Sequence, residues 1–225
     1  MTTKTRTPAA ILEDAREAQA AADDLETKAA AALDEARQID ADSVDLIVDD
    51  PAEAERITRE VSTRERLANA YRVKARAERT RRDGLILDAL TAETARLDLQ
   101  AEKAEKAATA HQARVDELLA QLEDLDGVSY QVAPTRKDMS GNPVEWPETK
   151  GDDLAQDGRR LRYQAAVLRY YLEHKTIPES TLVLDWRDPD GAAHALNPST
   201  AGPYFVAPML AAHLAGAALS YTPEA

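Results

Sequence analysis

Residues 85–125 read LILDALTAETARLDLQAEKAEKAATAHQARVDELLAQLEDL, and this stretch decides the predicted architecture. Apolar or small residues recur in it every seven positions, in two series separated by alternating steps of three and four. The first series is Leu87, Thr94, Ala101, Ala108, Val115 and Leu122. The second series is Leu90, Leu97, Ala104, His111, Leu118 and Leu125. This spacing puts both series on one helical face and is typical of a coiled coil.

The residues before this stretch also predict helix, because Glu53 to Leu125 contains no proline and a single glycine, Gly84. The apolar spacing changes phase at that glycine. Continuing the earlier series would select Arg82 and Leu85, whereas the later series uses Leu87 and Leu90. A phase change indicates a kink, a stutter or a turn. We favour a kink, since one glycine costs a helix only about 1 kcal/mol; a turn would instead produce a three-helix bundle.

An earlier helix is predicted over residues 8–39, starting at Thr7-Pro8. It contains eight acids and three bases, whereas residues 56–82 contain ten Lys/Arg and three glutamates. These opposite charges favour an antiparallel hairpin over a nucleic-acid-binding surface, which is the other interpretation of a basic run. The large side chains predicted to pack inside the hairpin are Ile11, Leu25, Ile39, Ile57, Val61 and Tyr71.

The connector between the two helices is acidic: residues 40–55 hold seven Asp/Glu and no base. Its spacing of aspartates at 40, 42 and 45 lacks the glycine and the closing glutamate of a calcium loop. The sequence Asp50-Pro51-Ala52-Glu53 has the pattern of a capping box at a helix start. A solvated turn is therefore the favoured interpretation.

The composition changes after residue 126, where nearly all prolines and aromatic residues lie. We expect helices at about 8–39, 53–82 and 85–125 in a first domain, 1–126. We expect a small α+β docking domain over 127–225, with a strand at 128–132, a helix at 153–174 and a β-hairpin between 181 and 196. Residues 203–221 carry no charge. Pro208 and His213 favour a short helix over a membrane span there, packed on the domain core or on a neighbouring subunit.

Little in the sequence points to chemistry. The net charge of −13 disfavours general nucleic-acid affinity, and the absence of cysteine excludes disulfides and thiolate metal sites. No phosphate loop, nucleophile elbow or zinc spacing occurs. The nearest acid/base cluster is Asp185, Asp188 and Asp190 with His194, which a turn explains equally well. We therefore expect no enzymatic activity, no cofactor and no metal.

The sequence predicts a structural function that depends on contacts between helices. The half of the long helix beyond Gly84 has no obvious partner within the chain, and we expect it to form an interface through Leu87, Leu90, Leu97, Val115, Leu118, Leu122 and Leu125. The leading hypothesis is a structural or assembly protein that forms a homo-oligomer or joins a larger assembly. Its layout is analogous to that of a bacteriophage capsid accessory or scaffold, and the N-terminus shows no Sec-type apolar segment, so a cytoplasmic or virion location is expected.

Two other functions remain open at this point. One is a regulatory adaptor that binds a protein partner through residues 85–125. The other is an enzyme with a helical appendage, which would require a polar cleft near Asp185 to His194.

Overall fold

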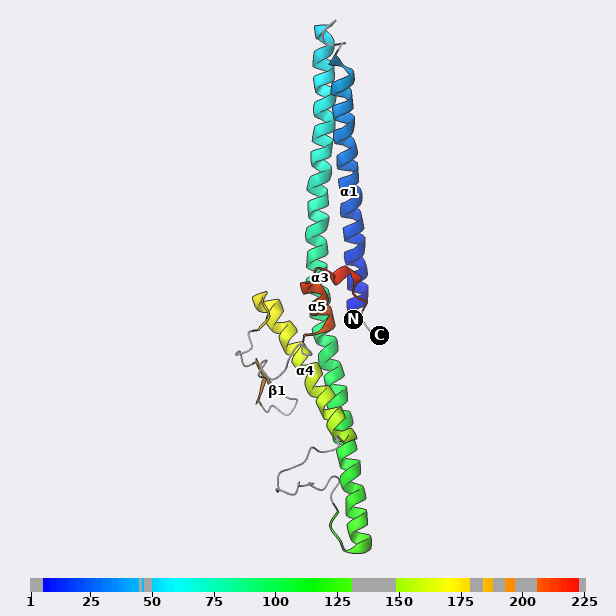
Figure 1. Ribbon diagram of the computed structural model, residues 1–225, viewed down its shortest axis with the longest axis vertical. Coiled ribbons are helices and arrows are strands. Elements are labelled where there is room, and N and C mark those ends of the chain that lie inside the picture. Colours follow the sequence, from blue (N-terminus) through cyan, green and yellow to red (C-terminus); the bar gives the residue numbers. More distant parts are fainter. Residues whose placement is uncertain are drawn as a thin grey trace, which may run out of the picture. The chain divides into compact units, whose positions relative to one another are not determined.

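The protein is mainly helical, and long helices pack side by side in it (Figure 1). The computed structural model describes residues 6–44, 46, 50–130, 149–178, 184–187, 193–196 and 206–222. Their elements are α1 (Pro8–Asp42), α3 (Pro51–Asp126), α4 (Lys150–His174), β1 (Leu184–Arg187), β2 (Ala193–Leu196), α5 (Pro208–Leu214) and the 3-10 helix η3 (Ala218–Ser220). They form two compact units, Met1–Leu90 with Ala212–Ala225, and Thr91–Ala211.

The first unit contains the predicted helical hairpin, in which α1 lies beside the early part of α3 (Figure 1). Thr7 caps α1 by accepting a hydrogen bond from the Ala10 amide, and Pro8 occupies the first turn. Alanines form most of the contact face, because small side chains let two helix backbones approach closely. One cluster joins Ala29 and Ala32 of α1 to Ala68 of α3.

The end of the chain also packs in this first unit. Ala218 of η3 forms a cluster with Ala15 of α1 and Ile86 of α3. Arg16 donates from Nε to the Leu219 carbonyl at 2.8 Å and from Nη2 to the Tyr221 carbonyl at 2.9 Å. These two bonds satisfy carbonyl groups that follow a short helix. The C-terminal residues are therefore part of the hairpin unit.

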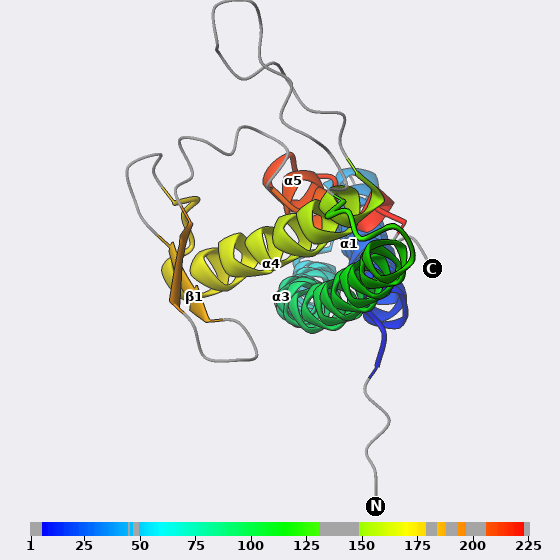
Figure 2. The same cartoon turned by 90° about the horizontal axis from the view of Figure 1, so that it is seen from below.

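The second unit is built on the later part of α3, with α4 lying beside it (Figure 2). The α4 helix starts in a capping box: the Thr149 side chain accepts from the Asp152 amide, and the Asp152 carboxylate accepts from the Thr149 amide. Four consecutive residues, Ala165 to Leu168, are buried, so α4 is covered over much of its circumference as expected. A two-stranded antiparallel hairpin, β1–β2, pairs Trp186 with His194.

One alternative considered for the fold is wrong, and one expectation is unsupported. The turn at Gly84 does not exist, because α3 runs as one helix from Pro51 to Asp126, and the three-helix bundle that depended on this turn is excluded. A small α+β domain is not supported, since α4 packs along α3 and the chain end packs on α1. The domain boundary expected at residue 126 stays a prediction.

Several expected features fall at the edge of the described residues or outside it. The predicted strand at 128–132 is not found at its described residues, Val128 to Tyr130, which have no regular structure. Asp188 and Asp190 of the expected acid/base cluster lie outside the described residues. The expected C-terminal helix, residues 209–219, is observed as α5, a turn containing Gly216, and η3.

Candidate helix-docking surface on α3

The helices α3 and α4 approach each other closely at Gly158. A Cβ atom built at Gly158 would lie 3.1 Å from Glu105 Cγ and 3.7 Å from the Ala101 carbonyl oxygen. Ala101 belongs to the predicted heptad series and is fully buried. The heptad face of α3 is therefore occupied here by a helix of the same chain, and small residues on both sides permit the close approach.

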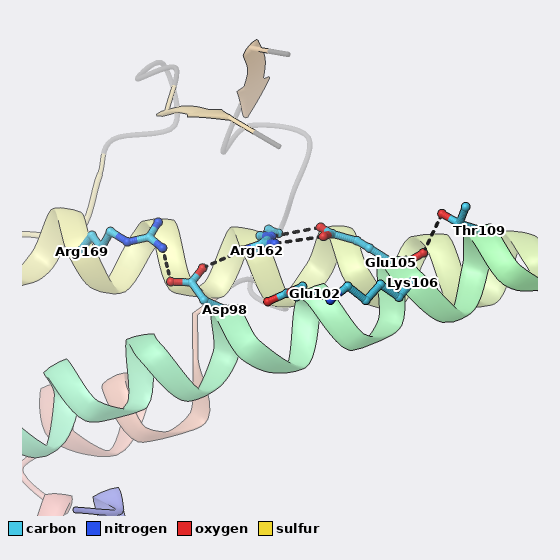
Figure 3. A network of polar contacts seen from close by, with 7 residues as sticks. All are labelled: Asp98, Glu102, Glu105, Lys106, Thr109, Arg162 and Arg169. Atoms are coloured by element: carbon cyan, nitrogen blue, oxygen red, sulfur yellow. Dashed lines mark hydrogen bonds and ion pairs between the residues drawn. The ribbon is translucent and has the colours of Figure 1, made fainter. Parts of the chain in front are cut away.

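Charged side chains fix this helix pair on its flank (Figure 3). Arg162 of α4 donates from Nε and Nη2 to the two carboxylate oxygens of Glu105, at 3.0 and 2.9 Å, and from Nη1 to Asp98 at 3.2 Å. Arg169 also donates to Asp98. The hydrogen bonds from Arg162 to Glu105 raise the pKa of the guanidinium, against the lowering effect of burial. Bidentate arginine–carboxylate pairs are directional, so this network selects the register of α4 on α3.

The α4 helix covers the heptad face only as far as His111. Its first turn lies there, since a Cβ atom built on Gly151 would be 3.3 Å from His111 Cδ2. Beyond that residue the heptad positions of α3 become accessible: Val115 is half-buried, while the exposed fractions are 43% for Leu118, 41% for Leu122 and 79% for Leu125. These four residues form what we call the distal stripe, and they are the candidate docking surface.

The predicted interface residues thus divide into two groups. Leu90 and Leu97 are 0% and 2% exposed, and Leu87 is half-buried, so all three are packed within the chain itself. The other four predicted residues are those of the distal stripe. Heptad spacing identifies every member of the helical face but carries no information on which turns of that face another segment of the same chain covers.

The predicted hairpin residues differ in how far they are buried. Ile11 and Ile57 are buried, whereas Leu25, Ile39, Val61 and Tyr71 are half-buried. Tyr71 packs against the alanine cluster of Ala29, Ala32 and Ala68. Leu12 is fully buried but was not predicted, because it lies one residue outside the alternating series.

The basic run of α3 interacts with α1 as the opposite charges predicted. Arg64 pairs with Glu35 at 2.8 Å, Arg79 pairs with Glu26 at 2.8 Å, and Arg82 donates to Gln19. In these three pairs the residue number decreases along α1 while it increases along α3, so the two helices are antiparallel. Around Glu26 and Arg79 lies an open hollow of about 350 Å³ lined by Glu26, Ala29, Ala30, Arg72, Arg76 and Arg79. Its lining offers no nucleophile or acid–base pair.

Among the described residues, sequence reasoning missed the most deeply buried charge, Glu93. Glu93 of α3 has no exposed surface, and Arg96 holds both of its carboxylate oxygens at 2.7 Å. The only sequence signal for this pair is a glutamate followed by an arginine three residues later, and that spacing is far more common on solvated helix faces.

The described residues provide no metal-binding group of three or more His, Asp or Glu side chains. For the expected cluster around His194, the structure describes the backbone pairing of Asp185 with Ala195 and of Trp186 with His194. Within the described ranges, no helix is long and apolar enough to cross a membrane.

Comparison of the chain with protein families, with curated proteins and with solved structures gives no match.

Proposed function

We propose that this protein is a non-enzymatic assembly protein that associates through the distal stripe of α3. The observation that supports this proposal is the exposure of Leu118, Leu122 and Leu125 on the helical face that α4 covers at Ala101. Burying a leucine side chain contributes about 1.5–3 kcal/mol to the free energy of folding or association. Three leucines exposed on one helical face therefore indicate a surface that another helix covers. A bacteriophage capsid accessory is one setting for such a protein.

Multi-angle light scattering over a range of protein concentrations tests this function. We expect a defined oligomer in the wild type and a monomer after Leu118→Asp combined with Leu122→Asp. The matched control is Leu99→Asp, because Leu99 is 55% exposed on the same helix but lies outside the heptad series. The Leu99→Asp variant should remain an oligomer.

Two results would contradict the proposal. One is a wild-type protein that stays monomeric up to millimolar concentration. The other is an oligomer that Leu99→Asp disrupts as strongly as the stripe variant does. Circular dichroism of each variant checks that α3 remains helical, since the substituted positions are exposed and an aspartate there should leave the fold intact.

A further inference from the structure

The distal stripe occupies one side of an otherwise acidic helical segment. Residues 113–126 contain Arg114 and five acids, Asp116, Glu117, Glu123, Asp124 and Asp126. At about 100° per residue, the acids at 116, 117, 123 and 124 lie more than 90° from the centre of the stripe. The edges of the stripe carry Arg114 and Gln121 on one side and Leu119 and Asp126 on the other. An identical segment can therefore cover the stripe without bringing the four outer acids into the contact.

We propose that the stripe is covered by the same stripe of a second copy of this chain, in antiparallel orientation, with Leu118 of each copy beside Leu122 of the other. This inference rests on the proposed function and specifies its partner and geometry. In that register Val115 of each copy lies beside Leu125 of the other. The contact then pairs positions of the first heptad series with positions of the second, as in antiparallel coiled coils.

The position of α4 favours the antiparallel orientation. In a parallel pair, both helices would continue side by side toward His111, where α4 covers the heptad face of each copy. The two α4 helices would have to separate the pair just beyond Val115. In the antiparallel pair, each α3 ends near the point where the other begins to carry α4, so the overlap consists of the uncovered segment only.

Charge favours the same orientation. Glu123, Asp124 and Asp126 lie at the C-terminal end of α3, where the helix dipole is also negative. A parallel pair would bring two such ends together. The antiparallel pair separates them by the length of the overlap, about 20 Å at 1.5 Å per residue, and puts each end at the level of the partner's Arg114.

Disulfide trapping tests this geometry. The natural chain has no cysteine, so only the introduced cysteines can form a cross-link. We expect Leu118→Cys and Leu122→Cys to cross-link poorly when each is oxidised alone, and a mixture of the two to give the mixed dimer. Val115→Cys alone is the matched negative control.

The outcomes separate this inference from the proposed function. Efficient cross-linking of Leu118→Cys or Leu122→Cys with itself indicates the parallel pair and overturns the inference, while association through the stripe stands. A wild-type oligomer that depends on the stripe but gives no cross-link at any of these positions also overturns it. A monomer in light scattering removes both the inference and the function on which it rests.

Discussion

Arg96 holds both carboxylate oxygens of Glu93 at 2.7 Å, one helical turn away on α3, while Glu93 is completely excluded from solvent. A carboxylate in that position has lost its hydration, and the two hydrogen bonds from Arg96 replace the contacts with water. Removing one partner of a buried ion pair typically costs about 3–5 kcal/mol, whereas replacing both by apolar residues costs much less.

We therefore expect Arg96→Met to lower the free energy of unfolding by about 3 kcal/mol. The double variant Glu93→Met, Arg96→Met should recover most of that loss, because no unpaired charge remains. Urea denaturation followed by circular dichroism measures both. A double variant that is less stable than Arg96→Met alone would show that the pair does more than neutralise a buried charge.

Arg162 should contribute more to stability than other arginines of α4. Its side chain is 15% exposed and joins Glu105 and Asp98 of α3. Arg162→Ala therefore removes the cation paired with Glu105 and leaves Asp98 paired with Arg169. We expect a loss of about 1–2 kcal/mol in urea denaturation. Arg160→Ala is the matched control: Arg160 is 54% exposed and pairs with Asp157 on its own helix, and its loss should stay below about 0.5 kcal/mol. Equal losses for the two variants would argue against the network as a register device.

Two glycines within helices should respond differently to substitution by alanine. At Gly84 a Cβ atom meets nothing within 4 Å, so Gly84→Ala should stabilise the protein by about 0.5–1 kcal/mol through helix propensity. At Gly158 the Cβ atom would lie 3.1 Å from Glu105 Cγ, and Arg162 restrains that glutamate. Gly158→Ala should gain nothing, and Gly158→Val should be destabilised. Thermal unfolding measures all three, and a stabilised Gly158→Val would contradict the close contact.

The capping box of α4 predicts a specific response to acid. The Thr149 hydroxyl and amide donate to the Asp152 carboxylate and lower its pKa below the ordinary value of 3.8. A lowered carboxyl pKa contributes stability that is fully present above 3.8 and is lost as the pH falls through the lower value of the folded state. The unfolding free energy of Asp152→Asn should therefore depend less on pH below 3.8 than that of the wild type. Asp153→Asn removes a neighbouring acid of the same turn while preserving the capping box, and serves as the control.

Sequence reasoning predicted the helices and the hairpin because each depends on local information. The missing prolines between Glu53 and Leu125, the Thr7-Pro8 start and the alternating steps of three and four are properties of neighbouring residues. The opposite charges of residues 8–39 and 56–82 indicated which helices pair, and Arg64 with Glu35 and Arg79 with Glu26 confirm it. The turn considered at Gly84 does not form, because the free-energy cost of one glycine in a helix is smaller than the stability that the surrounding strong helix formers provide.

The sequence by itself determined that α3 is long, amphipathic and suited to helix packing. Only the tertiary structure decided which part of its apolar face is used within the chain. Ala101 is covered because Gly158 permits close approach and Arg162 fixes the register, whereas Leu118 and Leu122 lie beyond the start of α4. The chain end packs on α1 because Arg16 satisfies the carbonyls of Leu219 and Tyr221. These contacts join residues far apart in sequence, so they depend on shape and hydrogen bonding that a periodic pattern does not encode.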